Sequence, residues 1–150
     1  MDKLRIMPVT NMELVYSVYA VAEAIWEQHY TPIIGEAQVE YMIEKFLSPD
    51  ALVEQINSGY EYFLFSYDYT FAGFASIEER GEELFLSKLY VDEEFRGKGI
   101  GKYMFQKFIE IAKMRNLKKI LALALVFCLG CFAACGGTGD KTILIGGTGP

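Results

Sequence analysis

The stretch that decides the fold runs from Leu84 to Arg115 and reads L-F-L-S-K-L-Y-V-D-E-E-F-R-G-K-G-I-G-K-Y-M-F-Q-K-F-I-E-I-A-K-M-R. It begins with an apolar run that is typical of a buried strand, and an acidic bend and a glycine-rich turn follow. From Ile100 onward, apolar residues recur at every third or fourth position. This order predicts a strand, a loop and one amphipathic helix.

The glycine-rich turn has the chemistry of an anion site. The first amides of a helix have no partner within the helix, and they lie at the positive end of its dipole. Glycine keeps side chains away from that backbone, so a phosphate can reach the amides. The turn consists of three glycines, three cations and one apolar residue, namely Arg96, Gly97, Lys98, Gly99, Ile100, Gly101 and Lys102.

Two familiar phosphate loops do not fit this turn. A Walker loop needs Ser or Thr after Gly-Lys, but Tyr103 follows Lys102. The dinucleotide fingerprint needs a third glycine where Lys102 stands, and it opens a βαβ unit, which the order of elements here does not provide. Neither an NTPase loop nor a dinucleotide fold is therefore predicted.

The spacing of Arg96, Gly99 and Gly101 resembles the acyl-CoA loop of the GNAT acetyltransferases, in which Arg or Gln is followed after two residues by Gly and then by Gly or Ala. The preceding Leu89-Tyr90-Val91 resembles the central strand of that family. The resemblance implies that residues 96–102 bind the pyrophosphate of acetyl-CoA and that residues 89–91 offer backbone groups to the pantetheine arm. It also implies direct transfer of the acetyl group to an amine, with a backbone amide of residues 89–91 polarising the thioester carbonyl.

The rest of the chain supplies the other elements of such a fold. A first strand is expected over residues 3–9. Thr10 and Glu13 predict a capping box for a helix that ends near Gln28, before Thr31-Pro32. Helices over residues 39–47 and from Ser48 to before Gly59, and strands over residues 62–67 and 71–77, complete the series. We expect an α/β (α+β) fold with a mixed, mostly antiparallel sheet flanked by helices, and an acetyltransferase domain over residues 1–120.

Composition narrows the class of protein. The 150 residues are 52% hydrophobic and 15% aromatic, which is typical of a folded domain with a substantial core. A net charge of −6 argues against a nucleic-acid partner, so a small anion is expected at the basic loop. The absence of cysteine from residues 1–120 and of a leader-like start favours a cytoplasmic domain. The oligomeric state stays open.

A base must take a proton from the acceptor amine. The candidates are four acids around the turn that precedes the central strand, and Glu79 is our choice among Glu78, Glu79, Glu82 and Glu83. The same acids can instead form a solvated edge, or attract a cationic acceptor such as a polyamine, as can Glu36, Glu40 and Glu44. The single histidine, His29, is a further candidate base or an ordinary polar residue.

The chain departs from the family pattern after Lys119. No tyrosine follows Tyr103, whereas many family members use a later tyrosine to protonate the leaving thiolate. Water or another residue must then supply that proton. The alternative is a protein that binds acyl-CoA without catalysing transfer. The acceptor is expected to be a primary amine of a small molecule or of a protein.

Residues 121–150 form an atypical apolar and glycine-rich tail. Lys118-Lys119, fifteen uncharged residues and Cys135 resemble a bacterial lipoprotein signal peptide, and residues 141–150 resemble the opening strand of a solute-binding protein. These likenesses suggest a fusion in which membrane association would involve residues 120–135. The alternative is that residues 120–127 serve as the fifth strand beside the central one. Cys128, Cys131 and Cys135 lack a fourth ligand of the usual spacing, so no metal site is predicted.

Overall fold

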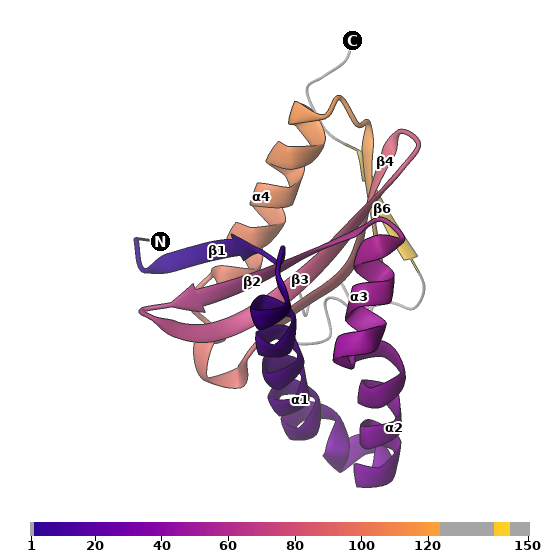
Figure 1. Cartoon of the computed structure of the whole chain (residues 1–150). Coiled ribbons are helices and arrows are strands. Elements are labelled where there is room, and N and C mark those ends of the chain that lie inside the picture. The colour runs from indigo at the N-terminus through magenta and orange to yellow at the C-terminus, as the bar shows by residue number, and fades with distance from the viewer. Residues whose placement is uncertain (1, 124–139, 145–150) are drawn as a thin grey trace.

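In the computed structural model, residues 2–123 and 140–144 are described (Figure 1). The chain forms strands and helices in the order β1 (Leu4–Pro8), α1 (Met12–Ile34), α2 (Glu36–Leu47), α3 (Pro49–Asn57), β2 (Tyr60–Tyr67), β3 (Thr70–Arg80), β4 (Glu83–Val91), the 3-10 turn η1 (Glu93–Phe95), α4 (Ile100–Met114), β5 (Lys119–Leu123) and β6 (Asp140–Leu144). This order confirms the predicted series of elements.

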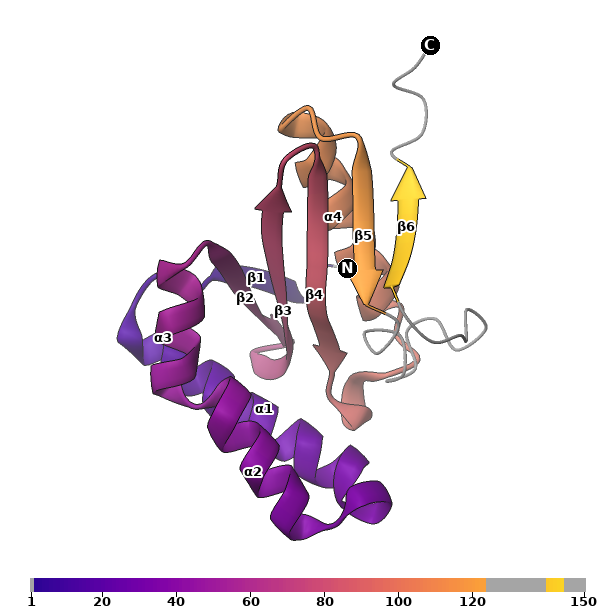
Figure 2. The same cartoon turned by 90° about the vertical axis from the view of Figure 1, so that its right-hand side faces the viewer.

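The strands form one mixed sheet in which spatial order follows chain order, from β1 to β6. All neighbouring pairs are antiparallel except β4 and β5, which are parallel because α4 connects them as a crossover. Figure 2 shows α4 behind the sheet and α1, α2 and α3 in front of it. The mostly antiparallel sheet flanked by helices is the predicted fold class.

Two apolar cores hold the layers together, one on each face of the sheet. Behind the sheet, the apolar side of α4, including Met104 and Phe108, packs on β3, β4 and β5. In front, α1, α2 and α3 pack on the opposite face around Tyr62, Phe74 and Tyr90. Burying each large apolar side chain contributes about 1.5–3 kcal/mol, so the two cores fix the position of β4 between α4 and the front helices.

The start and the end of the first helix differ from the prediction. The N-cap is Asn11, whose side chain accepts a 2.9 Å hydrogen bond from the Leu14 amide, so the expected Thr10 capping box is wrong. The helix also continues through Pro32 to Ile34 instead of ending near Gln28. Proline lacks the backbone N–H that would donate a hydrogen bond, but the helix continues through it. The helix ends at Gly35, whose φ of 88° favours glycine.

The segment after Lys118 takes the position of the fifth strand. Residues 119–123 form β5, in parallel register with Glu83 to Leu86 of β4. The alternative in which residues 120–127 serve as the fifth strand is therefore confirmed for residues 120–123. The remainder of the expected lipoprotein-like segment, with its three cysteines, lies outside the described residues. None of the helices in residues 2–123 is long and apolar enough to cross a membrane.

Candidate active site

The end of β4 and the start of α4 enclose a hollow of about 270 Å³. It is lined by the glycine-rich loop and its two flanks, namely Val91, Phe95, Arg96, Gly97, Gly99, Ile100, Gly101 and Lys102. The structure therefore brings together most of the residues that the sequence assigns to the pyrophosphate. Lys98 belongs to the same loop but is not part of this lining.

Glycine allows the loop to turn into the helix. Gly97 and Gly99 both have a φ of 80°, a left-handed conformation that costs other residues roughly 1–2 kcal/mol. Gly99 is the N-cap, and the first intrahelical bond runs from the Tyr103 amide to the Gly99 carbonyl, at 3.0 Å. The amides of Ile100, Gly101 and Lys102 therefore precede the first intrahelical donor and are available to an anion.

Cationic side chains surround these amides. In the part of the chain that the structure describes, Arg96, Lys98 and Lys102 have no carboxylate within 4.0 Å. The Arg96 Nε donates to the Val91 carbonyl at 3.0 Å, so this residue ties the loop to β4 while its guanidinium keeps further donors. The Lys98 ammonium lies 5.6 Å from the centre of the Tyr67 ring. The site carries an uncompensated positive charge.

Residues 89–91 contribute their backbone to the site, because their side chains are buried. Leu89 and Val91 pack on the α4 side and Tyr90 on the α1 side. The Asp92 amide donates to the Ala72 carbonyl at 2.7 Å, so by alternation the amides of Leu89 and Val91 face away from β3. On that side, the described pairing of β4 with β5 covers Glu83 to Leu86. The amides of Leu89 and Val91 lie beyond this described pairing and point to the side on which an extended ligand would lie.

A bulge in β4 follows directly after the residues that pair with β5. Ile77 pairs with Leu86 and Ser76 pairs with Lys88, so Ser87 has no opposite residue in β3. A bulge bends its strand and redirects the residues that follow. On the β3 side, Gly73 lies so close to β4 that a Cβ there would stand 2.1 Å from the Tyr90 carbonyl oxygen.

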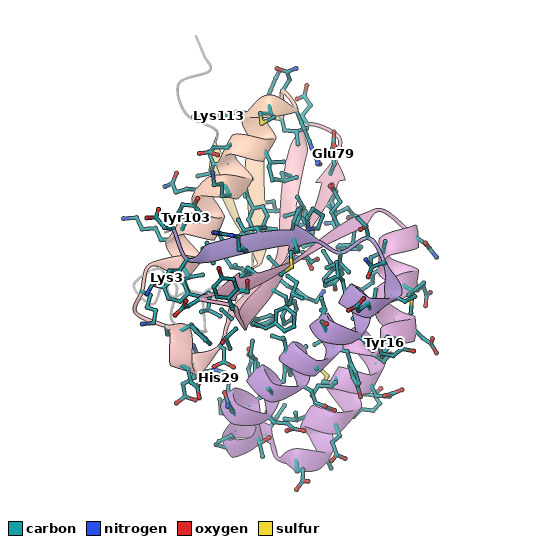
Figure 3. All side chains as sticks on the ribbon, turned by 60° about the vertical axis from the view of Figure 1, so that its left-hand side comes forward. Lys3, Tyr16, His29, Glu79, Tyr103 and Lys113 are labelled. Atoms are coloured by element: carbon teal, nitrogen blue, oxygen red, sulfur yellow. The ribbon has the colours of Figure 1, made fainter. Side chains whose placement is uncertain are left out.

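The two candidate bases lie in different regions (Figure 3). His29, at the end of α1, lies near η1. Burial lowers its pKa, the positive charge of Arg96 lowers it further, and Glu93 opposes both effects. Glu79 lies at the opposite end of the sheet, where it pairs in register with Leu84 and stands 3.5 Å from the Arg115 guanidinium. Leu84 is seven residues from Val91, roughly 23 Å along the strand.

The other acids that the sequence singled out also have defined positions. Glu78 forms a close ion pair with Arg80, and Glu82 and Glu83 lie 3.5 Å and 4.0 Å from the ammonium groups of Lys118 and Lys119. The acids Glu36, Glu40 and Glu44 are exposed on α2. Among residues 2–123 and 140–144, no cluster of His, Cys, Asp and Glu suitable for a metal ion is found.

Lys88 is a residue of interest to which the sequence reasoning assigned no role. It stands within the otherwise buried run of β4, directly after the bulge, and is itself only partly buried. A lysine inside a strand that reads as buried is the signal that could have identified it, since such lysines are rare unless they have a partner.

Comparison with known proteins agrees with this geometry. A family model described as "Acetyltransferase (GNAT) family" matches residues 18–129. The structure resembles that of the PaiA N-acetyltransferase from Thermoplasma acidophilum in complex with coenzyme A, with a TM-score of 0.75 and 19% identity over 94% of this chain and 97% of that chain.

Two further structures extend the fold similarity. The ribosomal-protein-S18-alanine N-acetyltransferase from Escherichia coli has a TM-score of 0.65 and 14% identity, over 97% of this chain and 96% of that chain. A GNAT family acetyltransferase from Brucella melitensis in complex with acetyl-CoA has a TM-score of 0.64 and 15% identity, over 98% and 91% of the two chains. The family match and these alignments extend past residue 120, and none of them supports a separate lipoprotein or solute-binding segment.

Proposed function

The chain belongs to the GNAT family of acetyltransferases, and from this premise we propose that it transfers an acetyl group from acetyl-CoA to a primary amine of a small molecule or a protein. The observation that carries the proposal is the start of α4. There, three amides without intrahelical acceptors lie beside a hollow that Arg96 and Lys102 line, and neither cation has a carboxylate within 4.0 Å among the described residues. A pyrophosphate is the chemical group that such a site fits.

The cofactor is proposed to bind with its pyrophosphate on the loop from Arg96 to Lys102 and its pantetheine arm along Leu89, Tyr90 and Val91. This pose is supported by the direction of the Leu89 and Val91 amides, which face away from β3. One of these amides would then stabilise the negative charge that develops on the thioester oxygen. Binding both reactants in one site replaces a bimolecular encounter by a reaction within one complex.

The chemical step is the attack of the neutral amine nitrogen on the thioester carbon. The carbon–sulfur bond breaks, the amide forms, and coenzyme A leaves as a thiolate that takes up a proton. Glu79 is our proposed base, and Glu78, Glu82, Glu83 and His29 are the alternatives. Water or another side chain is proposed to protonate the thiolate, and the aminolysis calls for no metal ion.

The acceptor is proposed to be a small amine or a protein amine. A polyamine is one alternative, favoured by the exposed acids of α2. Since acetyl-CoA is a cytoplasmic metabolite and residues 1–120 contain no cysteine, we propose that the reaction takes place in the cytoplasm of a bacterium.

The experiment that tests this function has two stages. Calorimetric titration of the full chain with acetyl-CoA is expected to show micromolar binding, and the absence of binding would contradict the proposed site. Release of thiol from acetyl-CoA in the presence of a panel of amines then measures transfer. Binding without acetylation of any small amine or peptide would favour the alternative function, an acyl-CoA-binding protein without transferase activity.

A further inference from the structure

A row of polar side chains crosses the sheet on the face that α1, α2 and α3 cover. Tyr62 of β2 pairs in register with Ser76 of β3, which in turn pairs with Lys88 of β4. Gln55 of α3 reaches this row, and its Oε1 accepts a 2.5 Å hydrogen bond from the Tyr62 hydroxyl. We call these residues, together with Ser87, the Lys88 cluster. The cofactor pose described above uses none of their side chains.

The neighbours of the Lys88 ammonium among the described residues are neutral. Its Nζ lies 3.3 Å from the Ser87 hydroxyl and 3.5 Å from Gln55 Oε1. It also lies 5.8 Å and 5.6 Å from the centres of the Tyr60 and Tyr62 rings. In the described part of the chain, no carboxylate lies within 4.0 Å of this nitrogen. Burial in these surroundings lowers the pKa of Lys88 to about 8.

The cluster contains more hydrogen-bond donors than acceptors. The ammonium donates to the Ser87 hydroxyl and, like the Tyr62 hydroxyl, to Gln55 Oε1, which is the single acceptor of the cluster without a proton of its own. The Gln55 amide is held in this orientation because its Nε2 donates to the Phe46 carbonyl at 2.8 Å.

Ser76 shows the same imbalance. It is fully buried, and its hydroxyl forms no hydrogen bond of ordinary geometry within the described residues. The hydroxyl is nevertheless close enough to Tyr62 to oppose part of the rise that burial causes in the pKa of that tyrosine. A buried hydroxyl without an acceptor is uncommon in proteins and requires an explanation.

The cluster lies beside the expected reaction centre. Lys88 directly follows the bulge at Ser87 and directly precedes Leu89, at which the cofactor pose begins. Helices α1, α2 and α3 cover the lower left of this face in Figure 2, and α3 contributes Gln55 to the cluster. Lys88 is only partly buried, so part of its side chain lies open to solvent.

We propose that the Lys88 cluster binds a carboxylate of the acceptor, so that the substrate class is an amine that also carries a carboxylate, such as an amino acid or a short peptide. A carboxylate supplies the acceptors that the cluster lacks and the negative charge that completes a buried ion pair with Lys88. A polycationic acceptor would instead place like charges together. This inference rests on the proposed function and specifies its acceptor.

The test compares acceptors that differ only in the carboxylate. Amino acids of increasing chain length, the carboxamide of each and one polyamine are offered to the wild type, to Lys88→Met and to Lys88→Arg, with thiol release as the readout. Lys88→Met keeps the length of the side chain and removes its charge, whereas Lys88→Arg keeps the charge. We expect Lys88→Met to raise KM for the acids by about 10- to 100-fold, with little change in kcat or in KM for the amides, and Lys88→Arg to restore part of the loss.

Equal use of acids and amides by the wild type, a preference for the polyamine, or an equal effect of Lys88→Met on both acceptor series would overturn the inference. Unchanged acetyl-CoA binding in calorimetry shows that Lys88→Met is folded. Acetate alone provides a measurement that does not require catalysis. It is expected to raise the unfolding temperature of the wild type more than that of Lys88→Met, and an equal effect on both contradicts the anion site. If the wild type does not bind acetyl-CoA but acetate still stabilises it more than Lys88→Met, the proposed function is contradicted and the anion site is not.

Discussion

The two ends of β4 are built in different ways. At its C-terminal end, the loop of residues 96–102 brings two cations, Arg96 and Lys102, and the first amides of α4 to one hollow, and the cations of this loop have no carboxylate partner among the described residues. At its N-terminal end, the four acids around the β3–β4 turn each lie within 4.0 Å of a cation, supplied by Arg80, Arg115, Lys118 and Lys119.

The difference separates a binding site from a charge-balanced edge. Uncompensated charge is costly to maintain, so it is typical of sites at which a ligand completes the pairing. Neighbouring charges of opposite sign lower each other's energy without a ligand. By this criterion, we propose that the C-terminal end of β4 with its glycine-rich loop, the loop end, binds an anion. The N-terminal end of β4 with the β3–β4 turn, the turn end, holds our proposed base, Glu79. Its catalytic role requires direct evidence.

The largest expected effect tests whether the turn end takes part in catalysis. If Glu79 is the base, Glu79→Gln removes proton acceptance with little change in shape and should lower kcat about 100-fold or more. The measurement is kcat with a saturating acceptor across a range of pH. His29→Gln is the competing variant at the loop end, for which we expect less than a threefold change.

The opposite result, a large loss for His29→Gln and none for Glu79→Gln, would assign proton transfer to the loop end. A small effect of both variants would point to water as the proton acceptor. The turn end would then be a structural edge, as its ion pairs suggest.

A matched pair of glycines tests the packing at the two ends. Gly73 pairs with Val91 near the loop, and a Cβ there would lie 2.1 Å from the Tyr90 carbonyl oxygen and 2.6 Å from the Phe65 ring. Gly73→Ala is therefore expected to cost about 3 kcal/mol in the free energy of unfolding, the upper range for overpacking. Gly81, at the β3–β4 turn, has a φ of 60°, which strains other residues, but no atom lies within 4 Å of the position of its Cβ. Gly81→Ala should therefore lower the free energy of unfolding by only about 1 kcal/mol.

Denaturant unfolding of both glycine variants measures these differences. Equal destabilisation would mean that β3 and β4 can separate near Val91 at low cost. The close approach of Gly73 would then not fix the position of the Leu89 and Val91 amides.

Two arginines test the cofactor site. Arg96→Ala should weaken acetyl-CoA binding by about 1–3 kcal/mol, because a charge-assisted bond to the pyrophosphate is lost and because the tie to the Val91 carbonyl no longer holds the loop. Arg115→Ala removes the same kind of side chain at the opposite end and should leave the affinity unchanged. Calorimetric titration of both variants decides the matter, and unchanged affinity of Arg96→Ala would remove this residue from the site.

Prediction from sequence located the glycine-rich turn and the buried face of α4 but misplaced both ends of α1. The glycines of the loop and the apolar period of α4 lie within one short stretch, so their spacing alone determined the turn and the buried face of the helix. The N-cap of α1 is Asn11, one residue after the expected cap, and α1 passes through Pro32 into an exposed last turn. Local signals at Thr10 and Thr31 therefore misplaced both ends.

The same distinction applies to the site residues. The salt bridges of Arg115 with Glu61 and Glu79 join residues far apart in the chain, as do the contacts of Lys88 with Gln55 and with the ring of Tyr62. These contacts follow from strand register and from a bulge at Ser87, and no periodicity in the sequence locates that bulge.

The smallest expected effects distinguish the ion pairs at the turn end from one another. Arg115 makes two hydrogen bonds to the Glu61 carboxylate, at 2.7 Å and 2.9 Å, and both side chains are partly exposed. A double-mutant cycle with Arg115→Met and Glu61→Gln should give a coupling of about 0.5–1 kcal/mol, since planar two-bond geometry is the favourable case for a surface pair.

Lys118 and Glu82 provide the control, because their side chains are 68% and 73% exposed and lie 3.5 Å apart. Their cycle should give a coupling near zero. Both cycles are measured by denaturant unfolding at low and at physiological salt, where screening should reduce the Arg115 coupling. Similar couplings for the two pairs would mean that bidentate geometry adds nothing at this end. Stability there would then come from the cores that α4 and the sheet share, and the charges would serve only to balance the edge.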